Sequence, residues 1–228
     1  MEIENVFDAD PGYKPELVIQ DDEDLSSHER FKKYIIKRFP LKIARELIAF
    51  YPNFEIDNYH KLKKLINQSA FFYGKPGTGK TFYACALVLL SKKKSWFYLD
   101  HNTRFFRVAD LFIELRRLIK NNDRDPDNGL WQFDSLVKKV SHCKWLILDD
   151  LGIEKNTDFT LEILDQIIDT RYQENRKTIV TTNYDIEQIT RKKEYSRIMS
   201  RLMDMVHGRP IHLLKTYRKV EIKINKFY

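Results

Sequence analysis

The sequence predicts an α/β fold in which helices cover both faces of a parallel β-sheet, and three observations support it. A strand-like run at residues 70–73 leads into a glycine-rich loop and then into a helix-like run at 81–90. A fully apolar run at 145–148 ends in two carboxylates, which is typical of a buried parallel strand. A third, β-branched run at 178–182 ends at Asn183. Helical patterns alternate with these strands, as parallel connections require.

The composition is that of an ordinary globular protein with one sizeable domain and a short appendage. The 228 residues are 43% hydrophobic and 32% charged. No apolar run approaches the roughly 20 residues that span a bilayer, and the first residues lack the basic-then-apolar order of a signal peptide. We therefore expect no membrane association. The two cysteines, Cys85 and Cys143, are expected to be reduced core residues, which suits the cytoplasm and excludes a zinc ribbon.

Charge is distributed unevenly along the chain. The net charge is +7, but residues 1–24 carry nine acids and one base, which leaves +15 on the remaining 204 residues. A basic body suggests a polyanionic partner, and nucleic acid is the usual candidate. A solvated, lysine-rich surface explains the same excess equally well.

Three segments follow from these patterns. Residues 1–25 are acidic, contain prolines and lack periodicity, so they predict a flexible tail. Residues 26–68 predict a short helical N-terminal element, which is too small for an independent core. Its expected helices run from a cap at Ser26 or Ser27 to about Arg38, from 41 to 50 and from 59 to 68. Residues 69–228 form the main domain.

Further elements are expected between and after the three strands. Residues 105–108 predict the second sheet strand, and 96–99 a hairpin partner or an extension. Asp110 is expected to cap the next helix. The remaining elements are helices at 111–120, 130–140 and 160–175, a polar loop at 121–128, a last strand at 210–214 and a basic tail at 215–228.

The loop after the first strand reads Gly74-Lys75-Pro76-Gly77-Thr78-Gly79-Lys80-Thr81, the pattern of a P-loop between a strand and a helix. Its glycines let backbone N–H groups turn inward and approach phosphate oxygens, and the helix N-terminus adds positive potential. Lys80 is expected at the β- and γ-phosphates, and the Thr81 hydroxyl at Mg²⁺. The residues expected to bind the nucleotide are Gly74, Gly77, Thr78, Gly79, Lys80 and Thr81. The chain is therefore predicted to bind ATP or ADP with Mg²⁺.

Polar residues at the ends of the two later strands complete the predicted site. Asp149 is expected behind Mg²⁺, and Asp150 is expected to orient or deprotonate a water molecule. Asn183 should lie beside Asp149 in a parallel sheet, although an Asn after a strand is also a common turn residue. Arg197 and Arg201 are four residues apart on one face of a predicted helix, and such arginines are usually solvated.

In this order, the motifs resemble those of the AAA+ ATPases and, within them, the DnaC/IstB-type helicase-loader family. The resemblance covers roughly residues 65–220. It implies a five-stranded parallel sheet between helices, without the large helical lid of most AAA+ proteins. The segments that carry it are 74–81, 108–111, 148–152, 168–171, 181–183, 197–202 and 216–218.

The resemblance also implies roles for individual residues. Asn183 is similar to a sensor I residue, and Arg201 resembles the arginine finger that reaches a neighbouring protomer, with Arg197 as second choice. Arg218 resembles a late arginine that substitutes for sensor II. The implied contacts with single-stranded DNA are Arg116, Arg117, Ile119, Lys120, Lys155, Thr157 and Phe159. A core role for Phe159 and a solvated face for the arginines stay open.

Two departures from the family pattern concern function. Asp150 stands where AAA+ proteins commonly have Glu, which shortens its reach to water. The region before the P-loop lacks any set of zinc ligands. The first hypothesis is a slow ATPase that oligomerises with ATP and helps place a hexameric replicative helicase on single-stranded DNA. The alternatives are an IstB-like transposition helper and a nucleotide-gated adaptor without turnover; a small-molecule phosphotransferase is disfavoured by the late arginines.

Overall fold

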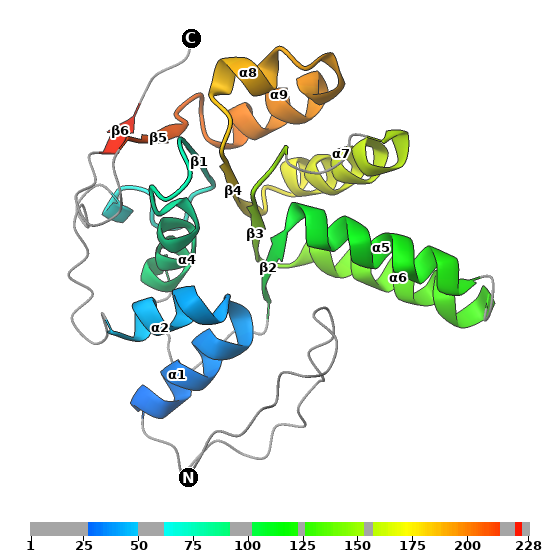
Figure 1. The fold of residues 1–228 in the computed structure, drawn as a ribbon, viewed down its shortest axis with the longest axis horizontal. Coiled ribbons are helices and arrows are strands. Elements are labelled where there is room, and N and C mark those ends of the chain that lie inside the picture. The colour runs from blue at the N-terminus through cyan, green and yellow to red at the C-terminus, as the bar shows by residue number, and fades with distance from the viewer. Residues whose placement is uncertain are drawn as a thin grey trace.

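The computed structural model describes residues 27–49, 62–91, 102–122, 126–152, 157–214 and 222–224, and its centre is one β-sheet. The sheet has six strands in the order β2-β3-β4-β1-β5-β6 (Figure 1). In chain order they are β1 (Ala70–Tyr73), β2 (Thr103–Arg107), β3 (Trp145–Asp149), β4 (Lys177–Thr182), β5 (Ile211–Leu213) and β6 (Ile222–Ile224). The first five pair in parallel, which confirms the predicted five-stranded parallel sheet. The antiparallel β6 was not predicted and lies in the expected basic tail.

Helices cover both faces of this sheet. They are α1 (Ser27–Arg38), α2 (Leu41–Ala49), α4 (Lys80–Ser91), α5 (Val108–Asn122), α6 (Pro126–His142), α7 (Asp158–Gln173), α8 (Ile186–Thr190) and α9 (Ser196–Met205), with a short 3₁₀ turn at Lys193–Tyr195. Beyond β5, the described part of the chain contains only β6, so it shows no helical lid there. Within the same residues, no helix combines the length and apolarity needed to cross a membrane.

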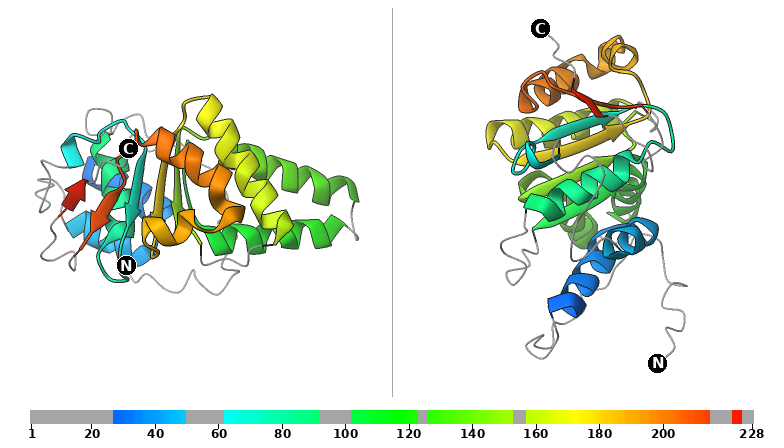
Figure 2. Two further views of the ribbon diagram at one scale, coloured as in Figure 1. Left: turned by 90° about the horizontal axis from the view of Figure 1, so that it is seen from above. Right: turned by 90° about the vertical axis from the view of Figure 1, so that its left-hand side faces the viewer.

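The alternation of side chains along the strands divides the core into two clusters. On one face, Phe72 of β1 and Ile147 of β3 pack with α4, and α1 and α2 join the same cluster (Figure 2). On the other face, Phe71 and Leu148 pack with α5, α7 and α9. The α5–α6 hairpin projects away from the sheet in both Figure 1 and Figure 2. The short N-terminal helices therefore share the core of the main domain.

Several predicted boundaries are wrong, for identifiable reasons. Asp110 does not cap α5, because that helix begins at Val108 and places Asp110 in its first turn. Val108 is fully buried and starts the apolar stripe, so the helix follows β2 without a loop. The expected loop at 121–128 shrinks because α6 begins at Pro126, and proline favours a first helical turn.

Two further predicted elements begin or end at other residues in the structure. Strand β2 begins at Thr103, two residues earlier than predicted. The helix expected to reach Gln68 gives way to turns after Lys63, and Asn67 adopts a left-handed φ of 62°. The tail at 1–25, the first part of that helix at 59–61 and the strand-like run at 96–99 lie outside the described residues.

Candidate nucleotide-binding site

The glycine loop joins β1 to α4 at the carboxyl edge of the sheet. Strand β1 pairs with β4, with Phe72 opposite Thr181, and β3 pairs with β4 on its other side. The carboxyl ends of these three strands therefore lie together, as expected for ligand sites in parallel sheets. The loop, Asp149 and the end of β4 form one site.

The loop conformation requires glycine at the positions that the sequence pattern specifies. Gly74 has a φ of 136°, and a Cβ atom there would lie only 2.4 Å from the backbone oxygen of Leu213. Gly77 and Gly79 have φ values of 81° and 86°, in the left-handed region that side chains disfavour. A Cβ on Gly77 would meet no atom within 4 Å, so conformation rather than space selects glycine there.

Lys80 is buried beneath this loop and is tied to it by its ammonium group. Only 5% of the residue is exposed, and Nζ donates hydrogen bonds of 2.9 Å to the backbone carbonyls of both Gly74 and Lys75. Thr78 Oγ1 donates to the same Lys75 carbonyl at 2.9 Å. Burial lowers the pKa of Lys80, and the charges of Asp150 and Asp149 oppose that shift. A buried cation inside a glycine cradle fits the phosphates of a nucleotide.

Asp149 ends β3 and contacts the first turn of α4. The residue is 4% exposed, and its Oδ1 accepts hydrogen bonds from Thr81 Oγ1 at 2.8 Å and Thr181 Oγ1 at 2.7 Å. Burial raises the pKa of Asp149, and the Thr181 and Thr81 hydrogen bonds oppose this rise.

The oxygen pair of Thr81 and Asp149 fits Mg²⁺, which prefers carboxylate, hydroxyl, water and phosphate oxygens. Among the described residues, no group of three or more His, Cys, Asp or Glu could hold a metal ion by itself.

Asp150 leaves the strand in a left-handed conformation, with a φ of 60°. Its backbone N–H donates to Thr181 Oγ1 at 3.0 Å, and its Oδ1 accepts from the side-chain amide of Asn183 at 3.1 Å. Asn183 thus contacts the second acid rather than Asp149. The turn directs the two consecutive carboxylates into different hydrogen-bond environments.

Thr181 was missed as a site residue by sequence reasoning. It is fully buried, and its hydroxyl connects Asp149 to the backbone of Asp150. The signal that could have identified it is its position: in a parallel sheet, it lies beside the end of β3, where a hydroxyl can reach the acid that ends that strand.

The two predicted finger arginines lie on α9 and pair with α7. Arg201 has 15% side-chain exposure and forms ion pairs of 2.6 Å with both Asp165 and Asp169. Arg197 is 69% exposed, and its Nε lies 3.5 Å from Asp165. Neither side chain pairs with the P-loop or the Asp149–Asp150 turn. Arg218 lies outside the described residues.

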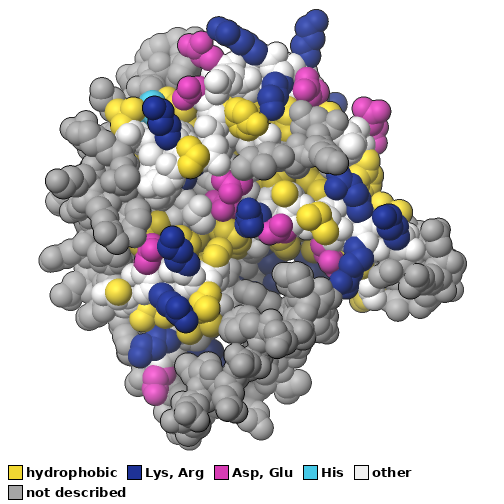
Figure 3. All heavy atoms as spheres, in the orientation of Figure 1, with side chains coloured by type: hydrophobic (Ala, Val, Ile, Leu, Met, Phe, Trp, Pro, Cys, Tyr) yellow, Lys and Arg dark blue, Asp and Glu magenta, His cyan; other side chains and the backbone are white. Residues whose placement is uncertain are grey.

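The residues of α5 that are predicted to contact DNA differ in exposure and pairing. Arg117 pairs with Glu114 at 3.5 Å, Arg116 is half-buried, and Ile119 and Lys120 are exposed. On the face in Figure 3, basic and acidic side chains are interspersed among the described residues.

The predicted DNA contacts after β3 have structural roles in the described chain. Thr157 caps α7 through a reciprocal capping box with Thr160. Phe159 is half-buried against the core, 6.3 Å from the Phe133 ring centroid. Their contact with DNA stays a prediction, and Lys155 lies outside the described residues.

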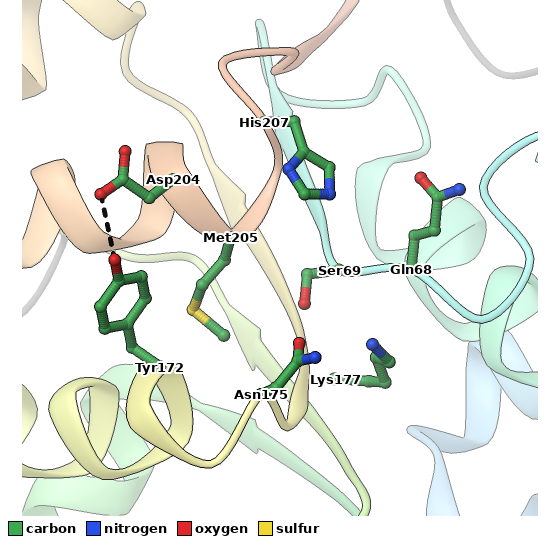
Figure 4. A pocket seen from close by; sticks show the side chains of 8 residues that line it. All are labelled: Gln68, Ser69, Tyr172, Asn175, Lys177, Asp204, Met205 and His207. Atoms are coloured by element: carbon green, nitrogen blue, oxygen red, sulfur yellow. Dashed lines mark hydrogen bonds between the residues drawn. The ribbon is translucent and has the colours of Figure 1, made fainter.

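A cavity of about 220 Å³ lies at the opposite, amino edge of the sheet, near the starts of β1 and β4 (Figure 4). Its lining residues are Gln68, Ser69, Tyr172, Asn175, Lys177, Asp204, Met205 and His207. The Tyr172 hydroxyl lies 3.5 Å from Asp204 across part of it. Because the glycine loop joins the other ends of the strands, this cavity is separate from the nucleotide site.

The strand, glycine loop, buried lysine and Thr81–Asp149 pair define a P-loop nucleotide-binding protein. Residues 62–219, more than half of the chain, match the family described as IstB-like ATP binding protein. The chain belongs to this family, which confirms the resemblance seen in its motifs.

Curated relatives of two kinds match this chain, a helicase loader and a protein of an insertion sequence. The replicative helicase loader DnaC of Escherichia coli (strain K12) is 29% identical over 136 residues, covering 59% of this chain and 49% of that protein. A protein of insertion sequence IS232 of Bacillus thuringiensis subsp. berliner is 27% identical over 139 residues, covering 61% of this chain and 50% of that protein. The chain thus matches about half the length of these relatives.

Several solved structures match this chain at low sequence identity and modest TM-score. A crystal structure of the DnaC helicase loader has a TM-score of 0.47 and 24% identity, covering 78% of this chain and 92% of that one. A crystal structure of DnaI has a TM-score of 0.48 and 19% identity, covering 80% and 93%. AMPPCP-bound DnaA from Aquifex aeolicus has a TM-score of 0.49 and 14% identity, covering 79% and 50%.

Proposed function

We propose that this chain is an Mg²⁺-dependent ATPase that helps place a replicative helicase on single-stranded DNA. The observation that carries the ATPase proposal is the joint placement of Lys80, Thr81 and Asp149 beneath one glycine loop. The loading role is supported by the similarity to DnaC, named as a replicative helicase loader. Because only about half of that protein is matched, the partner is part of the proposal.

Each residue has a role that follows from its environment. Lys80 exchanges its two carbonyl partners for phosphate oxygens, and the glycine N–H groups donate to the same phosphates. Thr81 and Asp149 would hold Mg²⁺, which when bound would neutralise charge on the phosphates of the nucleotide. Asp150, fixed by Asn183, orients the attacking water.

Of the two α9 arginines, we propose that Arg197 reaches the nucleotide site of a neighbouring subunit. Arg201 already has two carboxylate partners on its own chain and 15% side-chain exposure, whereas Arg197 is 69% exposed and only loosely paired. A solvated guanidinium can reach a neighbouring subunit without breaking buried ion pairs. We therefore expect a homo-oligomer in the ATP-bound state, and weak hydrolysis by the monomer.

ATP turnover, with and without single-stranded DNA, tests the enzymatic part. Asp150→Asn should lower kcat at least about 100-fold while ATP still binds, because the amide cannot accept a proton. Arg197→Ala should lower the oligomer's kcat about 10³-fold or more, the scale of other arginine fingers, and Lys192→Ala on the preceding loop is the control. Wild-type protein that binds ATP but never hydrolyses it would favour the adaptor alternative.

Co-purification with candidate replicative helicases tests the loading role. Helicase should be retained in ATP and released, or bound differently, in ADP. Failure to retain any helicase in either state would favour the second candidate, a transposition helper acting on double-stranded DNA. That candidate is supported by the similarity to the protein of insertion sequence IS232. Retention of a transposase on double-stranded DNA would establish it.

A further inference from the structure

The hydroxyl of Thr181 is the connection between the two acids of the site. It donates a 2.7 Å hydrogen bond to Asp149 Oδ1 and accepts a 3.0 Å hydrogen bond from the backbone N–H of Asp150. Thr181 is fully buried, so water cannot replace either bond without repacking. One oxygen atom therefore fixes the carboxylate of the first acid and the backbone of the second.

The second bond acts on a residue in an uncommon conformation. Asp150 has a φ of 60°, in the left-handed region that few residues other than glycine, asparagine and aspartate adopt. Thr181 also accepts, at its backbone carbonyl, a 2.8 Å hydrogen bond from Leu151 N–H. Strand β4 therefore holds two consecutive N–H groups of the turn through this one residue.

The neighbouring Thr182 provides an internal comparison. It too is fully buried, donates one hydrogen bond (2.7 Å, to Leu151 O) and accepts one (3.2 Å, from Tyr184 N–H). Its hydroxyl contacts backbone atoms only. The two adjacent threonines thus match in burial and in hydrogen-bond number, but only Thr181 contacts an acidic side chain.

We propose that Thr181 is a positioning residue for ATP hydrolysis, which aligns Asp149 for Mg²⁺ and holds Asp150 in its left-handed turn. This inference rests on the proposed ATPase function. Thr81 and Thr181 both donate to Oδ1 of Asp149, so the carboxylate is anchored at one oxygen, and the other, Oδ2, would be available to Mg²⁺. Groups that orient metal ligands in this way commonly change metal affinity or activity about 10–100-fold when removed.

Thr181→Val tests this role because valine keeps the shape and removes the oxygen. We expect kcat for ATP to fall at least about 10-fold with KM changed less than about 3-fold, as for other residues that orient metal ligands. The Mg²⁺ concentration for half-maximal binding of a fluorescent ATP analogue should rise about 10-fold, with binding in EDTA unchanged. Thr181→Ser, which restores the hydroxyl, should recover both values.

Thr182→Val is the matched control. It removes the same number of buried hydrogen bonds and should lower the melting temperature by a similar amount, with kcat and Mg²⁺ dependence unchanged. Equal effects of the two valine variants, or no recovery by Thr181→Ser, would overturn the proposal. If the wild-type protein showed no hydrolysis, the ATPase proposal would fail, and the Mg²⁺ dependence of binding would still decide the role of Thr181.

Discussion

Two buried charges lie at opposite ends of the same pair of strands, and their surroundings differ. Asp149 ends β3 at the carboxyl edge and is 4% exposed; Arg171 of α7 lies at the amino edge of β3 and β4 and is fully buried. All three guanidinium nitrogens of Arg171 donate hydrogen bonds. Their acceptors are the carbonyls of Val140, Ser141, Cys143 and Lys177, the hydroxyl of Thr178 and the thiol of Cys143.

The difference lies in how completely the chain itself satisfies each charge. No carboxylate of the described residues forms an ion pair with Arg171, but the carbonyls at the end of α6 carry partial negative charge toward it. Burial lowers the pKa of Arg171 to about 10, so it stays charged at neutral pH. Hydrogen bonds from the described residues reach Asp149 only at Oδ1. A buried charge with a filled set of partners supports the fold, whereas a buried charge with a free oxygen can still accept a ligand.

Removing the charge of Arg171, whose guanidinium nitrogens all donate hydrogen bonds, should have the largest effect on stability. Arg171→Met would leave several buried carbonyls without donors, and we expect the free energy of unfolding to fall by about 3–5 kcal/mol. Urea denaturation measures this change. Arg191→Met, at an exposed ion pair with Glu187, is the control and should change stability by less than about 0.5 kcal/mol. A loss below about 1 kcal/mol for Arg171→Met would contradict the structural role.

The comparison also explains which parts were predictable from sequence. The loop at 74–81 and the acids after β3 were predicted because their chemistry requires fixed residue types at fixed local spacing. The partners of Arg171 come from α6, from Cys143 in the turn after it and from β4, and those of Arg201 come from α7, so no local pattern reveals them. Thr181 connects β4 to β3 in the same way. Local spacing encoded the groups of the proposed nucleotide site, whereas tertiary packing supplied the residues that hold them in place.

Substitution of the loop glycines at the carboxyl edge of the sheet should give the next largest loss of stability. Gly74→Ala would place a Cβ atom 2.4 Å from a backbone oxygen and strain a φ of 136°, so we expect a loss of about 2–3 kcal/mol together with loss of ATP binding. Gly77→Ala strains φ without any clash, and we expect only about 1 kcal/mol. Thermal denaturation of both variants measures the difference. Equal losses would show that the close approach to Leu213 is relieved by a small shift of β5.

A charge-reversal cycle on α7 and α9 tests whether Arg201, like Arg171, stabilises the fold through partners in its own chain. The pair is partly buried, and Arg201→Glu should cost about 1–2 kcal/mol. Asp169→Arg in the same chain should recover part of that loss by restoring the ion pair. If ATP turnover recovers with stability, Arg201 acts structurally; if stability recovers and turnover does not, Arg201 rather than Arg197 acts in trans.

The smallest expected effect is a gain in stability rather than a loss, and it concerns Asp149, which accepts the hydrogen bonds of Thr81 and Thr181 at Oδ1 alone. Asp149→Asn keeps an Oδ1 acceptor for Thr81 and Thr181 but removes a buried negative charge, so we expect the melting temperature to rise by about 2–4 °C at neutral pH. Because burial raises the pKa of Asp149, the folded state binds this proton more tightly than the unfolded state. The contribution of Asp149 to the free energy of unfolding of the wild-type protein therefore falls as the pH rises from about 4 through the raised pKa.

The gain from Asp149→Asn should consequently be small near pH 4, grow with pH across that window and then stay constant. Melting curves from pH 4 to 8, with the exposed Asp134→Asn as control, measure it. Mg²⁺-dependent ATP binding should be lost in the same variant, because the amide does not neutralise the metal charge. A variant that melts lower than wild type at every pH would mean that Asp149 stabilises the fold, as Arg171 does, and that its other oxygen, Oδ2, is not held ready for a cation.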